Sequence, residues 1–283
     1  MINKVAVIGI GAMGSGIAYI SAWNGYSVHV RDISQEFVDQ GMNKIRQSVM
    51  TGVDKGKLSP LEGEKILKNI QATTETEEAA KDADLVIEAV FENIKVKKEV
   101  FSELDSICPE NTILASNTST LSITEMASVT ERPEKVIGMH FFNPVPAMKL
   151  VEIVIGEKTS KETHQAAEEF CKSLGKTTVK AKDSPGFIVN RVLLPTLNEA
   201  MKLADSGVAT KEDVDKAMML GANFPMGPFA LADYVGLDVA LAALNTIYEA
   251  FGEYYKPSET LKKLVEEGNL GMKTGKGFYE YAK

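Results

Sequence analysis

Short apolar runs alternate with longer stretches of helical periodicity through the first two thirds of the chain. The apolar, β-branched runs predict strands at residues 4–8, 26–31, 84–90, 112–116 and 135–141. Helical patterns follow them, up to residue 23 and then over residues 35–68, 96–104 and 122–127. A further alternating run, KLVEIVI, reads as one more strand. Strands that alternate with helices favour a parallel, doubly wound α/β sheet.

The pattern changes after Asp183-Ser184-Pro185-Gly186, where proline and glycine interrupt it. The remainder of the chain is almost entirely helical in its periodicity, and residues 188–194 and 239–250 both fit buried helices. The sequence therefore predicts two domains. Residues 1–184 would form the α/β domain, and residues 185–283 would form an all-helical C-terminal domain.

A glycine-rich turn follows the first predicted strand. It has the pattern G-x-G-x-x-G and consists of Gly9, Ile10, Gly11, Ala12, Met13 and Gly14. Between a strand and a helix, this pattern is typical of Rossmann-type dinucleotide sites, whose helix N-terminus offers N–H groups to a pyrophosphate. The same glycines also suit a purely structural bend, and that alternative stays open.

An acidic residue at the end of the second predicted strand strengthens the dinucleotide interpretation. Asp32 lies 18 residues after Gly14, where a carboxylate accepts hydrogen bonds from the ribose hydroxyls of NAD. It would repel the 2′-phosphate of NADP. Because Arg31 could accommodate that phosphate, NADP remains the less favoured alternative.

Composition narrows the class of protein further. The chain has 283 residues, 44% of them hydrophobic and 25% charged, with a net charge of -8 that disfavours nucleic-acid binding. Its two distant cysteines suggest neither a disulfide framework nor a zinc site, so we expect no metal and two buried thiols. No run reaches the length of a membrane span, and no signal peptide precedes the first strand. A cytoplasmic protein without membrane partners is expected.

One of the three histidines is placed for catalysis. His140 ends a strand in GMHFFNPVPAMKLVE, and ligands of open α/β sheets bind beyond the carboxyl ends of strands. A histidine there can exchange a proton near neutral pH. Glu152, twelve residues later, is the candidate partner that orients the imidazole, although an ordinary strand carboxylate fits its position too.

Two further polar segments are candidates for binding. Asn117 and Ser119 follow the strand at 112–116 and could bind a substrate oxygen or the nicotinamide ribose, or else form a capped turn. Asn190 follows the Pro-Gly break and could face a ligand cleft or bond within its own helical domain. The sequence has no nucleophile elbow at suitable spacing, which argues against a serine hydrolase.

Six segments together resemble the short-chain L-3-hydroxyacyl-CoA dehydrogenases, and most closely their bacterial 3-hydroxybutyryl-CoA type. They run through the whole chain in order: GIGAMGSGIA, EAVFENIKVKKEVF, SNTSTLSI, GMHFFNPVPAMKLVEIV, DSPGFIVNRVL and LGMKTGKGFYEY. The resemblance implies reversible, NAD-dependent oxidation of an (S)-3-hydroxyacyl-CoA to a 3-ketoacyl-CoA. It also implies a homodimer or larger homo-oligomer formed through the C-terminal domain.

The resemblance assigns a role to individual residues. His140 would exchange the proton with Glu152 as its partner, while Ser119 and Asn190 would hydrogen-bond the substrate oxygens. Coenzyme A would contact Ser48 and Lys55. On the cofactor side, beyond the glycine turn and Asp32, the matching positions are Glu92, Lys97, Asn117, Asn143 and Lys273.

Two other interpretations remain. A 3-hydroxy acid dehydrogenase acting on free acids would share the architecture but use a lysine of the helical domain, and the HFFNP segment argues against it. A non-catalytic nucleotide-binding protein of the same fold would not need His140, Glu152, Ser119 and Asn190 together.

Overall fold

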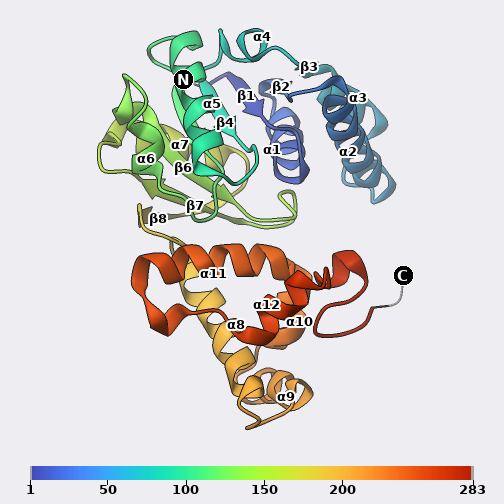
Figure 1. Cartoon of the computed structure of the whole chain (residues 1–283). Helices are drawn as coiled ribbons and strands as arrows, with labels where there is room; N and C mark the ends of the chain where they lie inside the picture. The colour runs from blue at the N-terminus through green and yellow to red at the C-terminus, as the bar shows by residue number, and fades with distance from the viewer. Residues whose placement is uncertain (1, 282–283) are drawn as a thin grey trace. The chain divides into compact units, whose positions relative to one another are not determined.

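The computed structural model describes residues 2–281 and divides into two compact units, Met1–Ser184 and Pro185–Lys283. The first, blue to yellow in Figure 1, builds helices around one sheet. The second, orange to red, is helical.

The sheet of the first unit has eight strands in the order β3-β2-β1-β4-β5-β6-β7-β8. Their bounds are β1 Lys4–Ile8, β2 Ser27–Arg31, β3 Ile70–Thr73, β4 Leu85–Glu88, β5 Ile113–Ser116, β6 Val136–Phe141, β7 Leu150–Ile155 and β8 Thr177–Lys182. Strands β1 to β6 pair in parallel, which confirms the predicted Rossmann-type sheet. The strand order reverses between β1 and β4, and crevices at such switch points hold ligands.

Helices connect the strands of this sheet. Their bounds are α1 Ala12–Trp23, α2 Gln35–Asp54, α3 Pro60–Lys68, α4 Thr76–Ala80, α5 Ile94–Ile107, α6 Ile123–Ala127, η1 Pro133–Lys135 and α7 Lys161–Ser173. The stretch expected to be helical over 35–68 is thus two helices. A turn through Gly56, whose φ is +67°, ends the first, and a capping box between Ser59 and Glu62 starts the second.

Three features of the sheet differ from the sequence expectation. Strands β3 and β8 were not predicted, because IQAT and TTVKAK are edge strands that carry few buried apolar residues. Strand β7 runs antiparallel to β6, which reverses the last part of an otherwise parallel sheet. The turn at residues 142–149 is too short for a parallel crossover, which needs a dozen or more residues.

The second unit packs its helices around an apolar core. Their bounds are α8 Val189–Asp205, α9 Lys211–Gly221, α10 Pro228–Val235, α11 Leu237–Phe251, η2 Glu253–Tyr255, α12 Glu259–Glu266 and η3 Met272–Thr274. The buried helix expected over residues 188–194 is present as the start of α8, but two of its apolar residues, Ile188 and Val192, are 41% and 67% exposed in this chain. The amphipathic face of α8 instead buries Leu194 and Leu197.

Buried Asp233 holds the end of the chain in this unit. Its carboxylate accepts hydrogen bonds from the backbone N–H groups of Phe278 and Tyr279 and from the hydroxyl of Tyr281. Among the described residues, no single helix is long and apolar enough to cross a membrane. Only α10 and α11, bent by 98° at their junction, reach that length and composition as a pair.

Candidate active site

The glycine turn contains two close backbone approaches at the carboxyl end of β1. Gly9 has a φ of +90°, and a Cβ there would lie 2.7 Å from the carbonyl oxygen of Ala89. At Gly14 a Cβ would meet the carbonyl oxygen of Gly9 at 1.8 Å. Only glycine therefore fits at either position.

Gly11 differs, because a Cβ there would meet nothing within 4 Å. It is the N-cap of α1, which has neither a side-chain cap nor an acid in its first turn. The positive end of this helix therefore has no capping side chain, and the space beside Gly11 fits the pyrophosphate of a dinucleotide. Ala12 and Met13 follow as the first residues of the helix.

Asp32 lies directly against this turn, just beyond β2. Its Oδ2 accepts a hydrogen bond from Ile10 N at 2.9 Å, and its Oδ1 accepts one from Ile33 N at 2.8 Å. The preceding Arg31 donates from Nε to the carbonyl oxygen of Thr74 at 3.1 Å. The carboxylate of Asp32 therefore contacts the glycine turn, while the guanidinium of Arg31 is hydrogen-bonded to a neighbouring loop.

His140 and Glu152 are brought together by the reversal of β7. The two residues are directly opposite in the antiparallel β6–β7 pairing, so their side chains leave the same face of the sheet. His140 Nδ1 and Glu152 Oε2 are 2.6 Å apart, and the side chains are 8% and 0% exposed. With Nδ1–H donating to the carboxylate, Nε2 is the nitrogen that can exchange a proton with a ligand.

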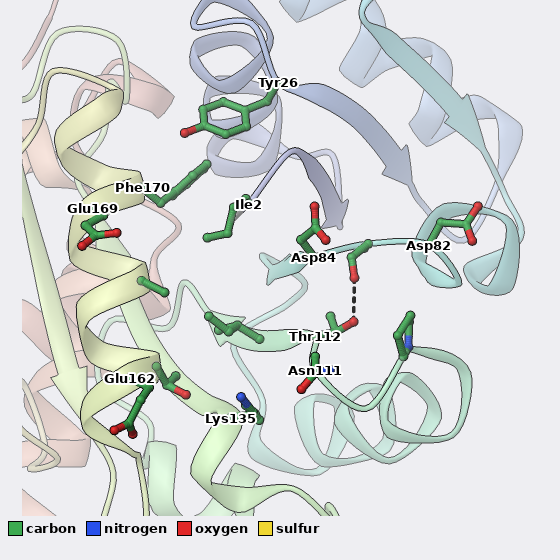
Figure 2. A pocket seen from close by; sticks show the side chains of 15 residues that line it. Ile2, Tyr26, Asp82, Asp84, Asn111, Thr112, Lys135, Glu162, Glu169 and Phe170 are labelled. Carbon is green, nitrogen blue, oxygen red and sulfur yellow. Dashed lines mark hydrogen bonds between the residues drawn. The ribbon is translucent and has the colours of Figure 1, made fainter.

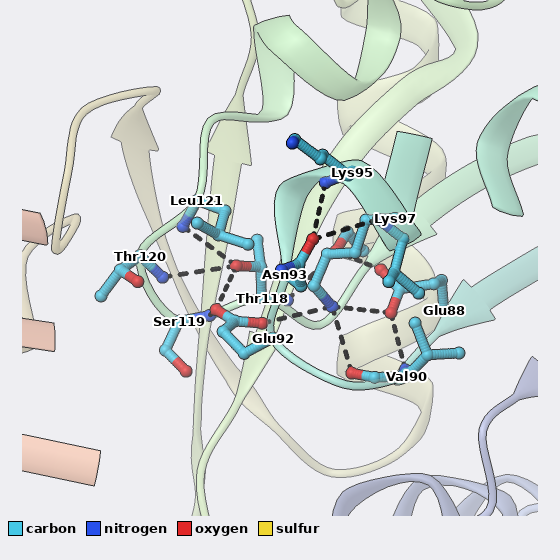
Figure 3. A network of polar contacts seen from close by, with 12 residues as sticks. Glu88, Val90, Glu92, Asn93, Lys95, Lys97, Thr118, Ser119, Thr120 and Leu121 are labelled. Atoms are coloured by element: carbon cyan, nitrogen blue, oxygen red, sulfur yellow. Dashed lines mark hydrogen bonds and ion pairs between the residues drawn. The ribbon is translucent and has the colours of Figure 1, made fainter. Parts of the chain in front are cut away.

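A polar network joins the ends of β4 and β5 to the start of α5 (Figure 3). Lys97, only 1% exposed, pairs from Nζ with Glu88 at 2.7 Å and with Glu92 at 3.2 Å. Glu88 is fully buried, and its Oε2 accepts from Ser116 Oγ at 2.7 Å. These contacts fix a buried cation between two carboxylates at the strand ends.

The same network shapes the loop that follows β5. Glu92 Oε1 accepts hydrogen bonds from Thr118 Oγ1 at 2.5 Å and from Ser119 N at 2.9 Å (Figure 3). Asn117 Oδ1 accepts from Phe141 N at 3.0 Å, which ties this loop to the residue after His140. Ser119 is thereby placed at the same sheet edge as the histidine.

Glu88 is the member of this network that sequence reasoning missed. The available signal was an acidic residue inside the apolar run DLVIEAV. A carboxylate in a strand buried on both faces needs a partner. The partner, Lys97, is nine residues away on a helix, and only the fold reveals the pairing.

A cavity of about 580 Å³ opens beside α1, and it contains the residues expected to contact coenzyme A. Ser48 of α2, Lys55 just after α2, and Asn143 beyond β6 all line it. The pocket therefore runs between two helices and the segment that follows the strand carrying His140.

Two predicted residues belong to the second unit. Asn190 is the second residue of α8, and Lys273 lies in η3. Lys273 Nζ contacts both carboxylate oxygens of Asp238, at 2.5 and 2.6 Å.

Another cavity, of about 460 Å³, lies at the amino ends of the strands (Figure 2). Its walls include Ile2, Asp84, Thr112 and Lys135, which precede β1, β4, β5 and β6. Ligands in open α/β sheets bind at the carboxyl ends of strands, so this cavity is not the candidate site. Residues 2–281 contain no group of three or more His, Cys, Asp or Glu side chains that could hold a metal.

Family comparisons cover almost the whole chain. Residues 4–184 match the domain family described as "3-hydroxyacyl-CoA dehydrogenase, NAD binding domain". Residues 186–281 match "3-hydroxyacyl-CoA dehydrogenase, C-terminal domain".

Individual relatives agree with the domain families. The chain is 50% identical to a 3-hydroxybutyryl-CoA dehydrogenase of Clostridioides difficile, over 99% of this chain and 100% of the relative. It is 44% identical to the human mitochondrial hydroxyacyl-coenzyme A dehydrogenase, over 99% of this chain and 92% of the relative. The crystal structure of (S)-3-hydroxybutyryl-CoA dehydrogenase from Ralstonia eutropha superimposes with a TM-score of 0.95 at 43% identity, covering 100% of both chains.

Proposed function

The chain belongs to the 3-hydroxyacyl-CoA dehydrogenase family of oxidoreductases, and we propose that it interconverts (S)-3-hydroxybutyryl-CoA and acetoacetyl-CoA with His140 and Glu152 as its acid–base pair. The observation that carries this proposal is the buried 2.6 Å contact between His140 Nδ1 and Glu152 Oε2. It commits Nδ1 to the carboxylate and orients the imidazole, so that proton exchange with the substrate runs through Nε2.

In the oxidation, His140 Nε2 accepts the proton of the 3-hydroxyl group as the C–O bond becomes a carbonyl. The negative charge of Glu152 stabilises the imidazolium that forms. Bound NAD supplies the chemistry that the side chains lack, because its nicotinamide accepts the hydride from C3. In the reduction, the imidazolium of His140 returns its proton to the 3-oxygen.

Ser119 and Asn190 hydrogen-bond the substrate oxygens in this proposal. The contact of Glu92 Oε1 with Ser119 N supports a fixed position for the serine. The remaining cofactor contacts come from Glu92, Lys97, Asn117, Asn143 and Lys273. Of these, Lys97 is held by two carboxylates and Asn117 by the backbone N–H of Phe141.

NAD is proposed over NADP because of Asp32. Its carboxylate lies against the glycine turn, where it would accept hydrogen bonds from ribose hydroxyls and repel a 2′-phosphate. The hydrogen bond from Arg31 Nε to the carbonyl oxygen of Thr74 supports this choice, since it directs the arginine towards that loop and not towards a 2′-phosphate.

The acyl-CoA occupies the cavity between α1 and α2, with contacts to Ser48 and Lys55. In this proposal residues 1–184 bind NAD, and residues 185–283 complete the substrate site and form a homodimer or larger homo-oligomer. The protein acts in the cytoplasm.

The test follows the reduced-nicotinamide absorbance with acetoacetyl-CoA, in parallel with NADH and NADPH. We expect the absorbance to fall rapidly with NADH. In His140→Ala we expect turnover to decrease about 10²–10⁴-fold, because a positioned acid–base group accelerates a reaction by about that factor. His164→Ala, on α7, is the matched control and should keep wild-type turnover. The proposal would be refuted if the wild-type protein binds NADH but does not oxidise it when any 3-ketoacyl-CoA is added.

A further inference from the structure

The cavity between α1 and α2 ends at an aromatic pair with no assigned role. Trp23 is the last residue of α1 and lines the cavity together with Tyr19, one turn earlier. The ring centroids lie 5.6 Å apart with 40° between the planes. Tyr19 is 3% exposed, whereas Trp23 is 40% exposed. The buried tyrosine therefore supports an indole that still has ring surface available.

The two helices run alongside each other in the same direction. A Cβ at Gly41 of α2 would lie 2.5 Å from Ile10 in the glycine turn, and one at Gly52 would lie 3.3 Å from the hydroxyl of Tyr19. Helix α2 thus passes the glycine turn first and Tyr19 last. Residues just after α2 consequently lie at the Trp23 end of the cavity.

The residues that line the cavity between α1 and α2 differ in charge between its two ends. Its charged residues are Lys44, Lys55 and Lys57, and among the described lining residues there is no carboxylate, although the chain as a whole has a net charge of -8. A flat aromatic face beside several lysines suits a purine with phosphate groups. The other end is lined by small or uncharged residues, namely Ala12, Ser15, Gly16 and the segment 143–147.

The length of the cavity suits a long ligand. From Ala12 to Trp23, helix α1 rises about 17 Å at 1.5 Å per residue. One end of the cavity begins at Asn143, just beyond the strand that carries His140, and the other reaches the tryptophan. Acyl-coenzyme A has an uncharged chain with a thioester at one end and a phosphorylated adenosine at the other. It matches a cavity whose uncharged end lies near the His140 strand and whose basic, aromatic end lies at Trp23.

We propose that the indole of Trp23 stacks on the adenine of coenzyme A and anchors the nucleotide end of the substrate. The ring of Tyr19 packs against the indole and holds it in place. The proposal rests on the proposed function, because it takes the substrate to be an acyl-CoA thioester. Trp23 contributes to binding and not to proton transfer, so its loss affects KM and leaves kcat unchanged.

The first experiment uses the fluorescence of Trp23, which is the single tryptophan of the chain. The holoprotein, saturated with NAD, is titrated with coenzyme A, with adenosine 3′,5′-bisphosphate and with pantetheine. Calorimetry records binding in parallel. We expect the first two to quench the emission and pantetheine to leave it unchanged. Coenzyme A that binds without changing the emission, or equal quenching by pantetheine, would overturn the proposal.

The second experiment compares two substrates. In Trp23→Ala, KM for acetoacetyl-CoA should rise about 5–150-fold, the range expected for the loss of one base–aromatic stack. KM for the acetoacetyl thioester of pantetheine should stay at the wild-type value, and Trp23→Phe should restore most of the loss. Tyr234→Ala, which removes an aromatic ring 53% exposed outside this cavity, is the control.

The outcomes separate the two proposals. An equal rise of KM for both substrates, or none for either, would exclude stacking while leaving the dehydrogenase reaction in place. A wild-type protein without turnover of acetoacetyl-CoA would exclude the reaction. Quenching by adenosine 3′,5′-bisphosphate would even then support the nucleotide site at Trp23.

Discussion

Replacing Glu152 by glutamine removes a buried charge while keeping the shape of the side chain. The amide oxygen can still accept a hydrogen bond from His140 Nδ1–H, so the imidazole keeps its partner and loses only the negative charge. The side chains of both residues are largely buried, and the contact is 2.6 Å long. The variant therefore isolates the electrostatic contribution of Glu152.

The size of this contribution follows from the geometry. With an imidazolium and a carboxylate whose charge centres are about 4 Å apart, and an effective dielectric constant of about 20, the attraction is about 4 kcal/mol. That energy corresponds to a decrease of roughly 10³-fold in turnover. Oxidation of the substrate creates this imidazolium from a neutral imidazole, so in that direction the effect falls on the chemical step.

The assay is the initial rate of NADH formation at saturating (S)-3-hydroxybutyryl-CoA and NAD, with thermal unfolding measured on the same samples. Glu157→Gln, an exposed carboxylate just past the end of β7, is the matched control and should keep wild-type rates. Combining Glu152→Gln with His140→Ala should cost little more than His140→Ala alone, because residues that act as a unit are not additive. Near-wild-type turnover of a folded Glu152→Gln variant would refute the acid–base pair.

Further predictions concern the cofactor, the substrate and the fold. Asp32→Ala should weaken NADH binding about 10–100-fold, as expected for hydrogen bonds to a charged group, with a smaller effect on NADPH; equal losses by calorimetry would contradict ribose recognition. Lys55→Ala should raise KM for acetoacetyl-CoA but not for the pantetheine thioester, and parallel changes would place this lysine away from the phosphates. Glu88→Ala should lower the free energy of unfolding by about 3–5 kcal/mol, because Lys97 is left buried without its nearest carboxylate; an unchanged urea midpoint would argue against this. Burial raises the pKa of the Cys108 thiol to about 12, so the thiol stays protonated in the folded chain while an unfolded cysteine ionises near pH 9. The free energy of unfolding should therefore fall as the pH rises from about 9 towards 12, and the native protein should resist thiol reagents at pH 8.

Much of the first unit could be predicted because its signals are local. A strand, a glycine turn, a helix and an acid occur within residues 4–32, and backbone geometry over so short a range follows from residue type. The all-helical pattern of the second unit is equally local, since a period of 3.6 residues is visible within a single helix. Both predictions of fold class are confirmed.

The edge strands and the contacts between distant residues needed the tertiary structure. Strands β3 and β8 carry little apolar signal, because an edge strand is covered on fewer sides. The sequence also permitted Glu152 to be an ordinary strand residue. Its distance from His140 depends on β7 turning back along β6 in a register that pairs these two positions.

The sequence by itself determined which chemical groups are present and in which local elements they lie: a glycine-rich turn between a strand and a helix, a strand-end histidine and one tryptophan at the end of a helix. Only the tertiary structure decided what surrounds each of them. It buried Glu88 against Lys97 and placed Trp23 in one cavity with Lys55. The physical reason is that burial and electrostatic pairing depend on neighbours in space, and strand register and helix packing bring those neighbours from positions far apart along the chain.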